Sequence, residues 1–70
     1  MNAGKIEYKG YEIRKSGKTL FKVMKDGEWV FYRRFVSVEA CKVSIDSSLE
    51  HRPYTPAEHA IVYPDASYRR

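Results

Sequence analysis

The sequence predicts an α+β fold in which a three-stranded antiparallel sheet packs on one α-helix. Three observations lead to this fold class. Residues 11–34 hold three short segments that alternate apolar and polar side chains, as half-buried strands do. Two turn sequences, Ser16-Gly17-Lys18 and Asp26-Gly27, separate these segments. From Val38 onward, apolar residues recur at helical spacing.

The predicted strands cover residues 11–15, 20–25 and 28–34. The last of them is rich in aromatic and β-branched side chains, which favour strands. Asp26-Gly27 is the strongest local signal in the chain, because a type I′ turn requires positive φ at both central residues and Asp-Gly tolerates it. We therefore expect the second and third strands to form a tight hairpin.

A helix is predicted to follow the strands. Ser37 is placed to cap it, and Glu39 in its first turn suits the positive end of the helix dipole. Its apolar stripe consists of Val38, Cys41, Ile45 and Leu49. Because serines weaken a helix, we expect it to end near Ser48. The position of Cys41 on the stripe favours a buried small hydrophobic side chain over a nucleophile.

The chain is short enough for one domain at most, and its composition divides it into three parts. Residues 1–10 are a polar, flexible arm, in which residues 5–8 are a candidate extra strand. Residues 11–49 are the β-β-β-α domain. Residues 50–70 are a C-terminal extension punctuated by prolines. Thr55-Pro56-Ala57-Glu58 has the features of a helix start, so the extension holds either a second short helix or an irregular tail lying on the domain.

Pairing across the Asp26-Gly27 turn sorts the strand residues onto two faces, because cross-strand partners share a face. The first face has an apolar centre of Phe21, Val23, Val30 and Tyr32, flanked by Glu12, Arg14 and Arg34. The second carries Leu20, Lys22, Met24, Trp29, Phe31 and Arg33. Burial of the unpaired Lys22 ammonium group is costly, so we place the helix on the first face.

The loop of the first turn decides where the first strand belongs. With a two-residue loop, Tyr11, Ile13 and Lys15 join the second, exposed face. With a three-residue loop, these three side chains lie on the first face instead.

The exposed face mixes aromatic with basic side chains, and three interpretations of it remain open. The tail covers it, or it is a protein interface, or it binds nucleic acid with rings against bases and cations on phosphates. The tail residues available for cover are Tyr54, Ile61, Val62, Tyr63 and Tyr68. The candidate residues for binding nucleic acid or a partner are Lys15, Lys22, Met24, Trp29, Phe31 and Arg33.

Net charge is +4, and the basic excess belongs to the sheet region. Residues 1–42 hold ten Lys/Arg against five Asp/Glu, which gives +5, and residues 43–70 hold three against four, which gives −1. This asymmetry fits an anionic partner such as nucleic acid, although ordinary surface lysines give the same balance.

The sequence does not indicate catalysis or a bound metal. No segment brings a nucleophile, a base and a stabilising group together, so we expect no enzyme and no cofactor. Cys41, His51 and His59 have irregular spacing for a zinc site. No apolar run approaches the ~20 residues that span a bilayer, so we expect no membrane partner. With a single cysteine, a cytoplasmic location is the simplest expectation.

Residues 17–46 resemble a family of small DNA-binding domains. The family pattern is a GK turn, an alternating strand, a glycine-containing turn, an aromatic strand ending in Phe, and a helix that begins T-x-E-E-A and ends near Asp. The matching residues are Gly17-Lys18, Phe21-Lys22-Val23, Gly27, Val30-Phe31-Tyr32, Phe35, Ser37-Val38-Glu39 and Ile45-Asp46. The segment is similar to the plant ethylene-response-factor domain and to its relatives at the amino ends of phage and transposon integrases.

The resemblance implies that the exposed sheet face enters the major groove, with Lys22, Met24, Trp29 and Phe31 at groove-facing positions. Met24 and Trp29 stand where the plant domains carry arginine, so the bidentate donors that read guanine are missing. The resemblance thus implies a DNA-binding or DNA-associated accessory protein of a phage or other mobile element, which binds DNA non-specifically or by shape. The alternative is a protein-interaction module or homodimer that uses the same face.

Overall fold

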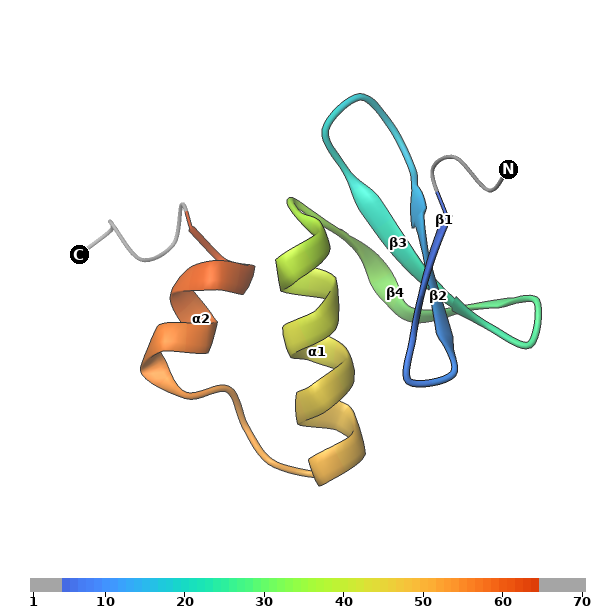
Figure 1. The fold of residues 1–70 in the computed structure, drawn as a ribbon. Helices are drawn as coiled ribbons and strands as arrows, with labels where there is room; N and C mark the ends of the chain where they lie inside the picture. The colour runs from blue at the N-terminus through green and yellow to red at the C-terminus, as the bar shows by residue number, and fades with distance from the viewer. Residues whose placement is uncertain (1–4, 65–70) are drawn as a thin grey trace.

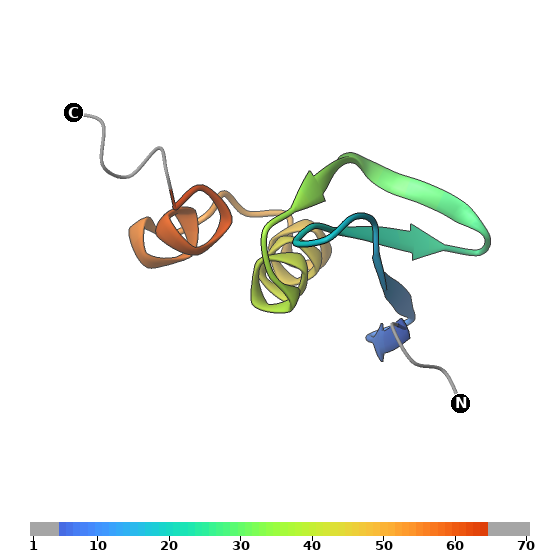
Figure 2. The ribbon, with the colours of Figure 1, turned by 90° about the horizontal axis from the view of Figure 1, so that it is seen from above.

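The computed structural model describes residues 5–64, which form one antiparallel sheet and two helices (Figure 1). In chain order the elements are β1 (Lys5–Tyr8), β2 (Tyr11–Lys15), β3 (Phe21–Lys25), β4 (Glu28–Phe35), α1 (Val38–Glu50) and α2 (Pro56–Val62). The strands lie side by side in sequence order. In both views α1 lies between the sheet and α2 (Figure 2). The α+β class and the antiparallel sheet are confirmed, but the predicted number of three strands is wrong.

The fourth strand is β1, which confirms residues 5–8 as the candidate extra strand within the stretch expected to be a flexible arm. It pairs with β2 across a tight turn at Lys9 and Gly10, where both φ values are positive (51 and 87). The Lys9 ammonium group lies 2.7 Å from Asp46 Oδ1 on α1, and the Tyr8 hydroxyl donates to the same carboxylate. These contacts attach residues 5–10 to the domain. Residues 1–4 of the predicted arm lie outside the described residues.

Both helices begin where their capping sequences predict. The hydroxyl of Ser37 accepts a hydrogen bond of 3.0 Å from the Ala40 amide at the start of α1. At α2, Thr55 and Glu58 form a reciprocal capping box, which confirms the second helix. Helix α1 ends at Glu50, two residues beyond the expected Ser48, and Leu49 of the predicted stripe is exposed.

The core lies between the sheet and the helices. Its buried apolar residues are Ile13, Val23, Phe35, Ala40, Cys41, Ile45 and Val62. The burial of Val23 beside α1 residues confirms which sheet face receives the helix. Cys41 is buried as expected, and desolvation raises the pKa of its thiol to about 11. Because Val62 is part of this core, the extension up to α2 belongs to the same folded unit as residues 11–49.

The loop between β2 and β3 is longer than either length considered from the sequence. Lys15 pairs with Phe21, so residues 16–20 form the loop, and the Ser16 amide donates to the Leu20 carbonyl at 2.8 Å. Because the number of loop residues is odd, the side chains of β2 lie on the faces expected for the three-residue alternative. Ile13 is therefore buried, and the placement of Tyr11, Ile13 and Lys15 on the exposed face, which depended on a two-residue loop, is wrong.

Strand β4 contains a bulge that the hairpin register did not anticipate. Near the turn the predicted pairs form, with Met24 opposite Trp29. Beyond Val30 the pairing jumps to Phe21 opposite Phe35, so β4 advances five residues (30 to 35) while β3 advances two (23 to 21). Left-handed φ values of 69 at Phe31 and 48 at Tyr32 mark the bulge.

The bulge reverses the side-chain placement predicted for the middle of β4. Tyr32, expected in the core, is 84% exposed. Phe31, expected outside, stacks on Tyr11 with ring centroids 6.1 Å apart and meets the edge of Phe35 at 6.3 Å. Arg33, also expected outside, packs on Phe35 on the helix side of the sheet. Within residues 5–64, neither helix has the length and apolar character needed to cross a membrane.

Candidate functional site

The candidate site is the sheet face opposite α1, which we call the outer face. The core side chains of Ile13 and Val23 define the helix side, and alternate residues along each strand point the other way. Arg34 joins this face because its guanidinium carbon lies 5.8 Å from the ring centroid of Trp29. The outer face consists of Lys5, Glu7, Glu12, Arg14, Lys22, Met24, Trp29 and Arg34.

The charges of the outer face are partly paired. Four cations and two carboxylates leave it at 4 − 2 = +2. Glu12 lies 2.7 Å from the Lys5 ammonium group and 3.0 Å from Arg14 Nη2. The hydrogen bond from Lys5, with the charge of Arg14, holds the pKa of Glu12 below its ordinary value. Lys22 is the cross-strand neighbour of Arg14 and has no carboxylate partner among the described residues.

The aromatic part of the outer face lies on β3 and β4. Trp29 is 38% exposed and stands opposite Met24. Arg34 extends over the indole ring, and its Nε donates a 2.9 Å hydrogen bond to the Ser16 hydroxyl. The loop after β2 thus positions a cation beside a half-exposed ring. An indole placed in this way can stack on a nucleic-acid base or pack on an apolar side chain.

The described part of the tail does not cover Trp29. Tyr54, Ile61, Val62 and Tyr63 belong to the core cluster on the helix side. The interpretation in which these four residues cover the exposed face is therefore wrong. Tyr68, the fifth residue named for that cover, lies outside the described residues.

The structure keeps together three of the six predicted binding residues. Lys22, Met24 and Trp29 share the outer face. Lys15 is exposed, but it pairs with Phe21 at the end of the sheet, so it lies on the helix side. Phe31 and Arg33 lie on the helix side, as a result of the bulge.

Three basic residues of the outer face were missed from the sequence: Lys5, because residues 1–10 were interpreted as an arm, and Arg14 and Arg34. Arg14 was placed on the helix face together with Arg34, because both assignments assumed an uninterrupted two-residue register. The sequence does hold one relevant signal for Arg14: the segment from Ser16 to Leu20 contains three polar residues and a glycine, which suits a long loop. No comparable signal precedes Arg34, because the bulge residues are aromatic and favour strands.

The described residues contain no group of three His, Cys, Asp or Glu side chains arranged to hold a metal ion. No family model matches the chain, and no curated protein or solved structure matches it either. The similarity of residues 17–46 to the plant and integrase DNA-binding domains therefore stays a prediction.

Proposed function

We propose that the protein binds double-stranded DNA through the outer face, without strict sequence preference, as an accessory protein of a phage or other mobile element. The observation that supports this proposal is the asymmetry of the sheet. Both helices lie on one side of it, and the other side presents Trp29 and Met24 beside cations that no described helix covers. The role in a mobile element rests on the family resemblance alone.

Each group on the outer face has a task in this proposal. Lys22, Arg14 and Arg34 contact phosphates, because these cations have free donors directed away from the core. Trp29 and Met24 lie against sugars and the groove wall, where apolar surface is desolvated. Glu12 limits the number of phosphate contacts, because its one negative charge offsets one of the two cations with which it pairs, Lys5 and Arg14. The face therefore offers three phosphate contacts, which favours weak, salt-sensitive binding.

Binding of a labelled duplex tests the proposal. Three neutralised phosphates give a slope of log K against log salt of about −2.7, so a rise from about 50 mM to 200 mM salt weakens binding about 40-fold. Fluorescence anisotropy measures the slope, and the single tryptophan supplies a second signal because Trp29 is in the proposed contact. Absence of binding at low salt rejects the proposal.

A matched pair of lysine substitutions locates the contact. Lys22→Gln on the outer face should reduce the magnitude of the slope by about 0.9. Lys42→Gln removes the same charge from α1, on the other side of the sheet, and should leave the slope unchanged. Equal effects of the two substitutions would indicate attraction by net charge rather than binding by the outer face.

The second candidate function is a protein interface or homodimer on the same face. The half-exposed Trp29 beside Met24 favours it, because aromatic and Met side chains are enriched where proteins meet. Light scattering at several protein concentrations separates the two functions. A dimer that Trp29→Ala dissociates, together with no affinity for duplex DNA, would replace the first proposal by the second.

A further inference from the structure

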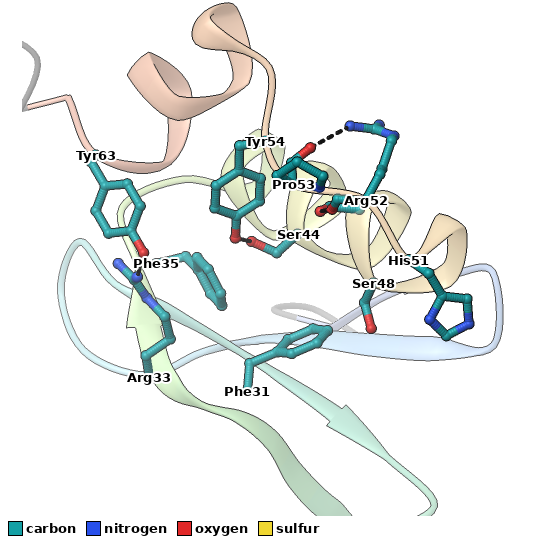
Figure 3. A pocket seen from close by; sticks show the side chains of 11 residues that line it. Phe31, Arg33, Phe35, Ser44, Ser48, His51, Arg52, Pro53, Tyr54 and Tyr63 are labelled. Carbon is teal, nitrogen blue, oxygen red and sulfur yellow. Dashed lines mark hydrogen bonds between the residues drawn. The ribbon is translucent and has the colours of Figure 1, made fainter.

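A pocket of about 540 Å³ opens on the helix side of the sheet, away from the outer face (Figure 3). Its volume lies within the range of small-molecule sites. The end of β4, one side of α1 and the segment before α2 enclose it. The lining residues are Phe31, Arg33, Phe35, Ser44, Ser47, Ser48, His51, Arg52, Pro53, Tyr54 and Tyr63.

Arg33 forms a cationic wall of this pocket. Its guanidinium carbon lies 5.0 Å from the ring centroid of Phe35 and 4.5 Å from that of Tyr63. Nη1 donates a hydrogen bond to the Tyr63 hydroxyl, and Figure 3 shows the two groups meeting at the edge of the pocket. Nε is buried without any acceptor, and no described carboxylate pairs with this arginine. Among residues 5–64, Arg33 is therefore a partly buried cation without a counterion.

Three other polar side chains of the pocket, those of Ser44, Ser47 and Arg52, have partners. The Ser44 hydroxyl is hydrogen-bonded to Tyr54 at 2.7 Å, and Ser47 donates to the Arg52 carbonyl. The Arg52 guanidinium binds Glu58 at 2.7 Å and 2.9 Å. No Asp or Glu is among the lining residues. The unmatched positive charge of the pocket thus comes from Arg33.

We propose that this pocket binds a small aromatic carboxylate. The carboxylate satisfies the Nε and Nη2 edge of Arg33, because a guanidinium presents two parallel donors along that edge and Nη2 has no described partner either. Nε is covered in the present rotamer, so the side chain turns slightly toward the ligand. The ring of the ligand lies among Phe31, Phe35 and Tyr54, which provide apolar walls.

The composition of the walls selects this ligand class over a bare phosphate. A phosphate dianion is best matched by several cations, whereas the pocket has one cation that is not already neutralised. Four aromatic side chains line it, namely Phe31, Phe35, Tyr54 and Tyr63. A singly charged group on a flat apolar body therefore complements both the charge and the surface of the pocket.

Titration of the full chain with phenylacetate and with its neutral amide, phenylacetamide, tests the proposal by ¹H–¹⁵N NMR. Phenylacetate should shift the backbone amides of Phe31, Arg33 and Ser48, and it should bind at least about tenfold more tightly than phenylacetamide, because one charge-assisted pair is worth that factor. Equal affinity for the two probes, or shifts away from the pocket, would overturn the proposal. Inorganic phosphate that binds as tightly as phenylacetate would also overturn it.

Three variants assign the contact to the pocket. Arg33→Gln should abolish the preference for phenylacetate over phenylacetamide, whereas Arg34→Gln, a change of the next residue that points to the outer face, should preserve it. Ser48→Phe fills the exposed rim from α1 without touching Arg33 and should block both probes. If Arg33→Gln fails to fold, Ser48→Phe still decides, because undiminished binding in that variant contradicts the assigned site.

Discussion

Arg33 and Arg34 are consecutive residues of β4, yet their guanidinium groups lie in two different regions of the molecule. Arg34 extends over Trp29 on the outer face, where Ser16 holds it near solvent. Arg33 is enclosed by Phe35 and Tyr63 on the helix side, with one donor left without an acceptor. The outer face offers several cations to an extended polyanion, whereas the pocket offers one partly buried cation to a compact anion.

The comparison shows how strongly environment determines what a positive charge can do. On the outer face, water and salt screen each cation, so several must act together to bind a partner. In the pocket, low solvent exposure strengthens the interaction with a single carboxylate and leaves an unmatched donor costly. The β4 bulge determines which arginine lies in which environment, because it reverses the alternation of side chains between Val30 and Phe35.

The largest difference between the two regions should appear in stability. Phe35 is 1% exposed at the pocket, whereas Trp29 on the outer face is 38% exposed. Phe35→Ala should lower the free energy of unfolding by about 3–5 kcal/mol through loss of buried surface and cavity formation. Trp29→Ala should lower it by only about 1 kcal/mol. Urea denaturation measures both values, and equal losses would contradict the burial of the two regions.

A substitution at Tyr32 tests whether β4 contains the bulge that places Arg33 on the helix side and Arg34 on the outer face. Tyr32 is 84% exposed and has a φ of 48, a conformation that glycine adopts freely. Tyr32→Gly should leave the free energy of unfolding unchanged or raise it by up to about 1 kcal/mol, since relief of the left-handed conformation offsets the entropy of glycine.

Val36 provides the control for this substitution, because it is 46% exposed and does not have a positive φ. Val36→Gly should lower the free energy of unfolding by about 0.5–1 kcal/mol. The same loss for Tyr32→Gly would mean that β4 continues as a regular strand, and the assignment of Arg33 to the helix side and Arg34 to the outer face would fail with the bulge.

Acid should weaken the helix side through Glu58. The hydrogen bond from Arg52, followed by that from the Thr55 amide, lowers the pKa of Glu58 to about 2 from an ordinary value of 4.5. Because the folded-state pKa is the lower one, its contribution to stability is complete above pH 4.5 and is lost as pH falls to about 2. The exposed position of the pair keeps this contribution modest.

Glu58→Gln should remove this part of the pH dependence. Urea midpoints of the parent protein and the variant should converge as pH falls from 4.5 to about 2. Glu28→Gln, a change of an exposed carboxylate in β4 that has no ion pair among the described residues, is the matched control and should stay parallel to the parent over that range. A constant gap between Glu58→Gln and the parent at all pH values would exclude the ion pair with Arg52 as the cause.

On the outer face, Glu12→Gln should make DNA binding more sensitive to salt, in contrast to the lysine and arginine substitutions, which make it less sensitive. Loss of this carboxylate releases Lys5 and Arg14 from their ion pairs. The slope of log K for duplex DNA against log salt should become steeper by about 0.9, because Lys5 becomes available to a phosphate. Anisotropy at several salt concentrations measures the slope. An unchanged slope would place the DNA contact away from β1 and β2.

Local sequence signals predicted much of this fold. The caps at Ser37 and Thr55 and the Asp26-Gly27 turn depend on residues close in sequence, so their chemistry can be interpreted without the rest of the structure. The same holds for the helix-bearing face, since the charge of Lys22 excludes its face from the core. Gly10 was interpreted as flexibility, although it closes the turn that creates β1.

The composition of the candidate site was less predictable, because it depends on contacts distant in sequence. The bulge turns Phe31 toward Tyr11 and Phe35, and this packing outweighs the preference of an aromatic strand for regular alternation. The parity of β2 depends on how the loop after Lys15 closes, which a one-residue difference reverses. These two features removed Lys15, Phe31 and Arg33 from the outer face and placed Arg14 and Arg34 on it.

The salt dependence of duplex DNA binding, measured side by side for Arg34→Gln and Arg33→Gln, tests the central claim most directly. If the outer face binds DNA, Arg34→Gln should reduce the magnitude of the slope by about 0.9, whereas Arg33→Gln should leave it at the parent value. Equal reductions in the two variants, or a reduction confined to Arg33→Gln, would contradict the division of β4 between a DNA-binding face and the helix-side pocket.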